Sequence, residues 1–114
     1  MELKKYSFIK QIGAKGFYAE ITCKIEFDKS NKAIEIDENC QEWYAGIQFG
    51  LQYYKDNSNY NSINLNIIEI KSNVVDTSQI IVAFCVIKLL EEALGKLNKR
   101  IEFNEEKCFF EFDR

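Results

Sequence analysis

The chain has 114 residues, of which 46% are hydrophobic and 14% are aromatic. This length and composition predict one domain, residues 1–114, with a core that needs no metal ion or disulfide for stability. The formal net charge of −3 argues against a general nucleic-acid coat, because such proteins are strongly basic. Lysines are nevertheless frequent near the N-terminus, at Lys4, Lys5, Lys10 and Lys15. This local charge predicts either a small basic patch or an ordinary solvated face.

No segment of the sequence predicts a membrane span or a secretory leader. The longest apolar run, Ile80 to Ile87, has eight residues, whereas a helix needs about 20 to cross a bilayer. We therefore expect a soluble, cytoplasmic protein that does not bind membranes. The four cysteines lack metal-ligand spacing and the chain has no histidine, so we expect buried thiols and no disulfide, metal or cofactor. They are Cys23, Cys40, Cys85 and Cys108.

The sequence offers few side chains for catalysis. A serine or cysteine nucleophile lacks its commonest base in a chain without histidine. Glu91 and Glu92 are adjacent on a predicted helix, so their carboxylates do not face each other. Glu20 and Glu26 fall beside Lys24 on the outward face of a predicted strand, which is typical of cross-strand charge pairs. We therefore expect no enzyme activity.

Alternating hydrophobic residues predict a strand over residues 18–27, with one buried and one wet face. Residues 5–11 are its predicted partner, and glycines supply the permissive backbone of the connecting loop. The polar run 28–32 predicts a turn, which leads to a short third strand over residues 33–36. The expected buried face of the long strand is Ala19, Ile21, Cys23, Ile25 and Phe27.

A helix is predicted over about residues 40–55, capped from within residues 37–39. Gly46 and Gly50 lie four residues apart on this helix. Because glycine costs roughly 1 kcal/mol in a helix interior, we expect the backbone to approach a sheet or a second helix closely there. The expected buried face, which follows helical spacing, is Trp43, Ile47, Leu51 and Tyr54.

The next predicted elements are a strand and a long helix. Residues 63–70 alternate until Ile68, where a shift of register predicts a β-bulge. Asp76 and Gln79 resemble a capping box, and the apolar run after them predicts a helix to about Leu97 that is buried on several sides at its start. Its expected exposed residues are Glu91, Glu92, Lys96 and Lys99.

Closing strand material is predicted at residues 101–103 and about 106–112, with Cys108, Phe110 and Phe112 on one face. The element order is therefore β-β-β-α-β-α, then β. Strands followed by two helices predict an α+β fold with two layers, a sandwich of sheet and helices. We expect the long second strand inside the sheet and both helices on one sheet face.

Two short stretches give the chain a family resemblance. Residues 10–21 read Lys-Gln-Ile-Gly-Ala-Lys-Gly-Phe-Tyr-Ala-Glu-Ile, and residues 75–79 read Val-Asp-Thr-Ser-Gln. They resemble the Gln-Ser/Thr-Gly-Gly-x-Gly-Gln-Tyr/Phe loop and the Val-Asp-Ser-Ser turn of domain IV of elongation factor G and the related ribosome-protection translational GTPases. The resemblance covers about residues 8–97, as a stand-alone domain. It implies a left-handed βαβ crossover, an exception to the usual right-handed rule.

In that family the two loops, here residues 10–17 and 71–76, lie at a tip that enters the decoding centre of the small ribosomal subunit. The resemblance therefore implies a translation-related module that binds the ribosome or structured RNA. No Gly-x-x-x-x-Gly-Lys-Ser/Thr motif occurs in the chain, so we expect no GTPase activity. The candidate binding residues, which offer charge and backbone N–H groups to phosphate, are Lys10, Gln11, Gly13, Lys15, Gly16, Phe17, Lys71 and Asn73.

The tip departs from the family pattern, and a second interpretation stays open. Ile12 replaces a small polar residue, Ala14 replaces the second glycine, and Phe17 replaces a glutamine. Asn73 stands where the family favours a histidine. Exposed apolar side chains at a loop more often meet protein than RNA. The alternative is therefore a protein–protein interaction module, of a regulatory or immunity type, that uses the same fold as a scaffold.

Overall fold

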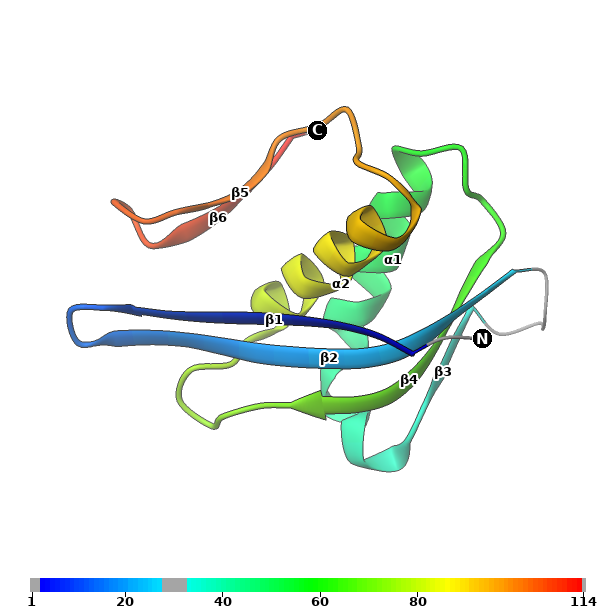
Figure 1. The fold of residues 1–114 in the computed structure, drawn as a ribbon. Helices are drawn as coiled ribbons and strands as arrows, with labels where there is room; N and C mark the ends of the chain where they lie inside the picture. Colours follow the sequence, from blue (N-terminus) through cyan, green and yellow to red (C-terminus); the bar gives the residue numbers. More distant parts are fainter. Residues whose placement is uncertain (1–2, 28–32, 114) are drawn as a thin grey trace.

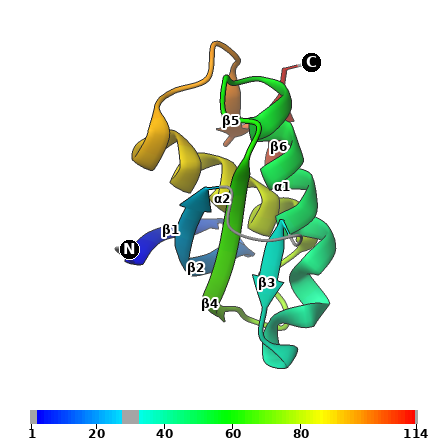
Figure 2. The ribbon, with the colours of Figure 1, turned by 90° about the vertical axis from the view of Figure 1, so that its right-hand side faces the viewer.

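A mixed four-stranded sheet forms one layer of an α+β fold, which the computed structural model describes over residues 3–27 and 33–113. The strands lie in the order β1-β2-β4-β3 (Figure 2). Strand β2 is antiparallel to both of its neighbours, and β3 is parallel to β4. The long strand therefore lies inside the sheet, as its alternation predicted; the predicted turn at 28–32 lies outside the described residues. The four strands are β1 (Leu3–Ile12), β2 (Lys15–Phe27), β3 (Ile34–Ile36) and β4 (Ile63–Lys71).

Two α-helices, α1 (Tyr44–Asp56) and α2 (Gln79–Leu94), form the second layer on one face of the sheet (Figure 1). The predicted helix over about residues 40–55 differs at its start, where a 3₁₀ helix, η1 (Glu38–Trp43), precedes α1. Asp37 caps η1 by accepting a hydrogen bond from the backbone N–H of Asn39, within the range predicted for the cap. Within the described part of the chain, no helix is long and apolar enough to cross a membrane.

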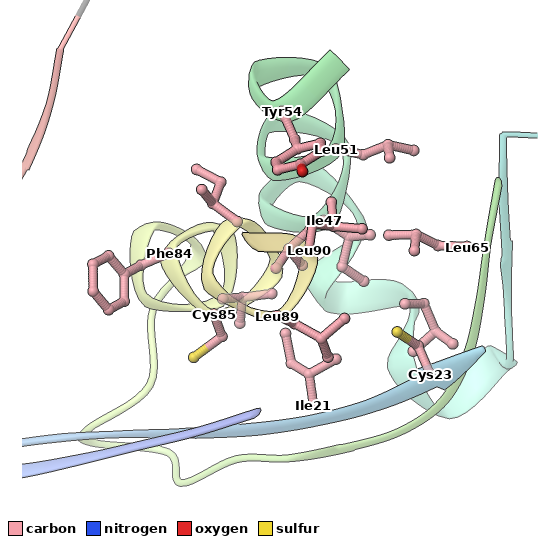
Figure 3. Packing of buried hydrophobic residues seen from close by; sticks show 14 of the residues in the cluster. Ile21, Cys23, Ile47, Leu51, Tyr54, Leu65, Phe84, Cys85, Leu89 and Leu90 are labelled. Carbon is pink, nitrogen blue, oxygen red and sulfur yellow. The ribbon is translucent and has the colours of Figure 1, made fainter. Parts of the chain in front are cut away.

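The hydrophobic core lies between the sheet and the two helices. Figure 3 shows Ile21 of β2 and Leu65 of β4 extending toward Ile47 of α1 and Leu90 of α2. Each of these four side chains is at most 1% exposed. Removing such a side chain from water contributes about 1.5–3 kcal/mol, so both helices are held on the sheet face that the alternation of β2 predicted as buried. Phe27, at the end of β2, is the exception on that predicted face and is 42% exposed.

Gly46 and Gly50 of α1 pack directly against α2, which confirms the predicted close approach. A Cβ atom at Gly46 would lie 2.5 Å from the carbonyl oxygen of Gln79, and one at Gly50 would lie 2.8 Å from that of Ala83. The backbone N–H of Gly46 also donates to the Gln79 side-chain oxygen at 2.7 Å. The free-energy cost of two glycines within α1 is therefore offset by the close packing of the α1 and α2 backbones.

The start of α2 differs from the prediction. Its N-cap is Ser78, whose hydroxyl accepts a hydrogen bond from the backbone N–H of Ile81, and not Asp76. Asp76 lies in the preceding loop, where its carbonyl oxygen accepts from the N–H of Tyr18. The chain is therefore bound to β2 at Asp76 and turns into the helix only afterwards.

The end of α2 also differs, because the helix stops at Leu94 and not near Leu97. Gly95 follows with a φ of 129°, a conformation that L-residues rarely adopt. Glu91, predicted as exposed, is buried: its carboxylate accepts from the backbone N–H of Leu97 at 2.9 Å and pairs with Lys88 at 3.3 Å. The carboxylate thus satisfies a donor in the segment that leaves the helix.

The predicted bulge in β4 is confirmed at Ile68. Thr22 pairs with Glu69 whereas its neighbour Cys23 pairs with Ile67, so Ile68 has no partner in the ladder. The extra residue restores the inward orientation for Ile70, which packs against the core.

The C-terminal segment forms a separate antiparallel hairpin of β5 (Ile101–Asn104) and β6 (Phe109–Phe112). Both predicted segments of closing strand material, 101–103 and about 106–112, thus contain a strand, but they pair as a hairpin where the predicted element order counted one strand. Residues 105–108 form the turn, in which the Asn104 side chain accepts from the N–H of Lys107. Cys108, predicted as an inward strand residue, lies in this turn with a φ of 57° and is only half-buried. The other three cysteines are buried, and all four are free thiols.

Aromatic rings attach the C-terminal hairpin to the rest of the fold. Phe110 packs on Phe84 of α2 and on Phe8 of β1, with ring centroids 4.8 Å and 5.5 Å apart. Phe112 packs on Phe49 and Tyr53 of α1, both at 5.8 Å. In Figure 3 the ring of Phe84 extends away from the main core, toward the side on which the hairpin packs. This aromatic cluster extends the sheet–helix core, to which Phe8 and Phe84 belong, toward the hairpin.

Candidate binding site at the β1–β2 tip

The two motif-bearing loops meet at one end of the molecule. In Figure 1 the loop of residues 72–78 lies beside the distal half of β2, and the β1–β2 turn extends beyond it. The backbone N–H of Tyr18 donates to the carbonyl oxygen of Asp76 at 3.0 Å, and the Thr77 hydroxyl donates to the carbonyl oxygen of Tyr18 at 2.7 Å. A Cβ atom at Gly16 would lie 2.5 Å from a carboxylate oxygen of Asp76. These contacts join two distant segments of the chain into one tip.

The β1–β2 turn has the geometry that its sequence favours. Gly13 and Ala14 are the two residues between the strands, and Gly13 has a φ of +59°. A positive φ at the first of two central residues fits a type II′ turn, which favours glycine there. The side-chain amide of Gln11 donates to the carbonyl oxygen of Gly13 at 3.0 Å. Gln11, a candidate binding residue, thus supports the turn from within.

Asn73 organises the second loop of the tip. Its side-chain oxygen accepts from the backbone N–H groups of Val75 at 2.9 Å and Asp76 at 3.2 Å. Its own N–H donates to the Thr77 hydroxyl at 2.8 Å, and its carbonyl oxygen accepts from the N–H of Thr77 at 3.1 Å. The loop is therefore fixed by hydrogen bonds while Val74 and Val75 project outward, 102% and 86% exposed.

Two of the three candidate lysines are paired with carboxylates. Lys10 lies 3.2 Å from Glu105 of the β5–β6 turn, and Lys71 lies 3.5 Å from Glu20 of β2. Lys15 is exposed and, among the described residues, has no carboxylate within ion-pair distance. The positive charge at the tip is therefore partly neutralised.

Glu20 connects three strands on the open face of the sheet. It accepts a hydrogen bond from the Ser7 hydroxyl at 2.9 Å and pairs with Lys5 at 3.6 Å as well as with Lys71. The Ser7 hydrogen bond, followed by the nearby lysine charges, holds the pKa of Glu20 below its usual value despite partial desolvation. Glu20 therefore stays ionised and keeps Lys71 engaged, as expected for a cross-strand charge pair.

The apolar surface of the tip differs from the one that the sequence suggested. Ile12 and Phe17 are half-buried, and the Phe17 ring packs on Phe103 at 4.9 Å. The exposed apolar side chains are instead Val74 and Val75. Sequence reasoning missed them because two valines between a strand and a helix show no periodicity, and it missed the burial of Phe17 because its partner lies far along the chain.

The structure therefore brings all eight candidate residues to one end of the fold but gives them different roles. Lys15 and the Gly13 turn face solvent, whereas Gln11 and Asn73 stabilise the loops. A shallow groove runs between the loops, lined by Ala14, Lys15, Gly16, Phe17, Val75 and Asp76. Within the described ranges, no three acidic or thiol side chains are placed to hold a metal ion. The groove with its exposed lysine and valine is the candidate binding surface of the fold.

The fold has a counterpart among solved structures. No protein-family model matches the sequence, and no curated protein matches it either. The crystal structure of ttk003000868 from Thermus thermophilus matches with a TM-score of 0.61 at 12% identity over 81% of this chain. The matched region spans 16% of the length of that protein. At this identity the likeness concerns the fold alone, so the same arrangement of sheet and helices also occurs as a small part of a longer chain.

Proposed function

We propose that this chain is a module resembling domain IV of elongation factor G that binds the small ribosomal subunit or structured RNA through its tip, without GTPase activity. The observation that supports the proposal is the junction of the two motif loops at Tyr18, Asp76 and Thr77. The same resemblance carries the expectation of a left-handed crossover from β3 through α1 to β4. A tip built from both loops is what the resemblance requires for insertion into an RNA site.

Contacts to phosphate would begin at Lys15 and at the exposed backbone of the Gly13 turn. Lys10 and Lys71 are engaged in surface ion pairs, which contribute only about 0–1 kcal/mol, so phosphate oxygens can replace their carboxylate partners. Each phosphate contact changes the slope of log affinity against log salt by about 0.7–0.9. We expect a slope between one contact and three, because Lys15 is unpaired among the described residues whereas Lys10 and Lys71 must first leave their carboxylate partners.

Co-sedimentation with purified small ribosomal subunits tests the proposal. The triple variant Lys10→Glu, Lys15→Glu and Lys71→Glu should abolish co-sedimentation, and rising salt should weaken that of the wild type. A triple variant with the same net charge, Lys24→Glu, Lys55→Glu and Lys96→Glu, changes lysines outside the tip and should bind like the wild type. The proposal would be ruled out if the wild-type protein did not co-sediment with small subunits at low salt.

A protein partner is the second candidate, and the exposure of Val74 and Val75 favours it. Two adjacent aliphatic side chains held outward by the Asn73 hydrogen bonds have no π-face for stacking on bases, but they fit an apolar pocket on a protein. The test is a pull-down that returns one protein partner, which Val74→Ser with Val75→Ser should abolish. Ile68→Ser, an exposed apolar residue away from the tip, should leave the capture unchanged.

A further inference from the structure

The distal part of the β1–β2 ribbon extends past the start of α2 (Figure 1). The helices therefore do not cover the inner face of the ribbon near its tip. The cross-strand pair on this face nearest the turn is Lys10 with Phe17. The next pair, Phe8 with Ala19, already contacts α2, where the Phe84 ring lies 5.3 Å from that of Phe8. A two-stranded ribbon with an uncovered apolar face is only marginally stable in water, so another segment must cover it.

The C-terminal hairpin supplies that cover. The Phe103 ring of β5 lies 4.9 Å from Phe17 and 5.3 Å from Phe8, both in edge-to-face geometry. Glu105 in the hairpin turn pairs with Lys10 at 3.2 Å. The hairpin therefore contacts both residues of the Lys10–Phe17 pair, which is the pair nearer the turn. Phe103 contacts Phe17, and Glu105 contacts Lys10.

The tip is thus fixed from two directions. Along the edge of β2, Asp76 and Thr77 bind both backbone groups of Tyr18. On the inner face, Phe103 fixes the side chain of the adjacent Phe17. Because Gly16 contacts Asp76 with no space for a side chain, a displacement of Phe17 would also separate the two loops that form the binding surface.

We propose that the C-terminal hairpin is a positioning element of the tip and that Phe103 is its positioning residue. The Phe103 ring keeps the β1–β2 turn in register with the loop of residues 72–78, so the hairpin belongs to the binding machinery although it lies outside both motifs. The effect on partner binding rests on the proposed function of the tip. The effect of Phe103 on the order of the tip is independent of that proposed function.

Phe112 provides a matched control within the same hairpin. It is also a half-buried phenylalanine, but its ring packs on Phe49 and Tyr53 of α1 and, at 6.5 Å, on Phe84 of α2. A general loss of stability would follow from Phe103→Ala and Phe112→Ala alike. Loosening of the tip should follow from Phe103→Ala alone.

The experiment is residue-resolved hydrogen–deuterium exchange of the full chain without any partner. Phe103→Ala should accelerate exchange of the Tyr18 amide and of the amides within residues 10–17 by about threefold to tenfold, the range expected for losing such an aromatic contact, relative to amides in α2. Phe112→Ala should leave the tip amides as in the wild type, and Phe103→Leu should restore most of the protection. Should Phe103→Ala fail to fold, Glu105→Gln removes only the ion pair to Lys10 and should accelerate the same amides to a smaller extent.

Unchanged tip exchange in Phe103→Ala, or equal acceleration in Phe112→Ala, would overturn the inference. A second measurement, co-sedimentation with small subunits, should show weaker binding by Phe103→Ala and wild-type binding by Phe112→Ala. If the exchange result holds but wild-type protein does not sediment with small subunits, the proposed function fails while the positioning role stands.

Discussion

Glycine at positions 46 and 50 shows how one hydrogen atom in place of a side chain sets the distance between two helices. The carbonyl oxygens of Gln79 and Ala83 occupy the space that a Cβ atom would need. Gly50→Leu should destabilise the protein by about 1–3 kcal/mol through overpacking, measured as a lower midpoint of chemical denaturation. Ala45→Leu, at an exposed position of the same helix, should change stability by less than about 0.5 kcal/mol. An unchanged midpoint for Gly50→Leu would contradict the close contact.

The buried thiol of Cys85 should make the fold less stable as the pH rises into the alkaline range. Burial raises the pKa of its thiol from 9.0 to about 12, whereas the unfolded thiol titrates near its ordinary value. Between these values the unfolded chain releases a proton that the native chain keeps. Stability from this group is therefore complete below pH 9 and is lost as the pH rises toward 12.

Denaturation midpoints measured across this alkaline range test the effect. The decline should be shallower in Cys85→Ala than in the wild type, because one thiol no longer contributes. Parallel slopes for Cys85→Ala and the wild type would show that this thiol does not titrate differently on unfolding.

At the scale of the element, the start of α2 depends on a hydroxyl at Ser78. Because an N-cap side chain satisfies a helix N–H that otherwise has no partner, Ser78→Ala should cost about 1 kcal/mol. Ser78→Asp keeps a capping oxygen and should retain most of that stability. Thermal unfolding followed by circular dichroism measures both variants, and equal melting temperatures for Ser78→Ala and the wild type would show that the cap is not used.

The elements show what local pattern predicts and what it does not. The alternation of β2 and the register shift at Ile68 could be predicted because a two-residue period is visible within the sequence of a single strand. The cap of α2 does not follow in this way, because Asp76 and Ser78 are both good capping residues and only the bond from Tyr18 to Asp76 decides between them. The hairpin turn at residues 105–108 was missed because one charged run separates two short strands of similar composition.

For the candidate site, the sequence predicted which loops form the tip but not how their side chains are arranged. The two loops could be assigned to one tip by resemblance, and the structure places them together. The orientation of their side chains depends on partners elsewhere in the chain: Glu105 engages Lys10, Glu20 engages Lys71, and Phe103 covers Phe17. Contacts between residues so far apart in sequence leave no periodic pattern, so they became visible only in the fold.

At the scale of the whole molecule, α2 packs within one continuous hydrophobic core that reaches from the sheet to the C-terminal hairpin. One face of the helix packs on the sheet and α1, while Phe84 joins the aromatic cluster under the C-terminal hairpin. The hairpin is fastened at its far end as well, where the Tyr53 hydroxyl donates to the carbonyl oxygen of Asp113 and the Asp113 side chain accepts from the N–H of Arg100. The hairpin therefore contacts the rest of the fold at both of its ends, and we expect it to unfold together with the core.

Removal of residues 101–114 tests this view of the molecule. The truncated chain would expose Phe8, Phe17 and Phe84 and should lose about 2–4 kcal/mol, equivalent to one or two fully buried side chains. Chemical denaturation should show the lower stability, and binding of an environment-sensitive hydrophobic dye should rise because the aromatic surface becomes accessible to it. The variant Glu106→Ala with Lys107→Ala alters only exposed turn residues and should behave like the wild type within about 0.5 kcal/mol. A truncated chain with the wild-type midpoint and no added dye binding would mean that the sheet–helix core is stable without the hairpin, and that the aromatic cluster contributes nothing to its cooperativity.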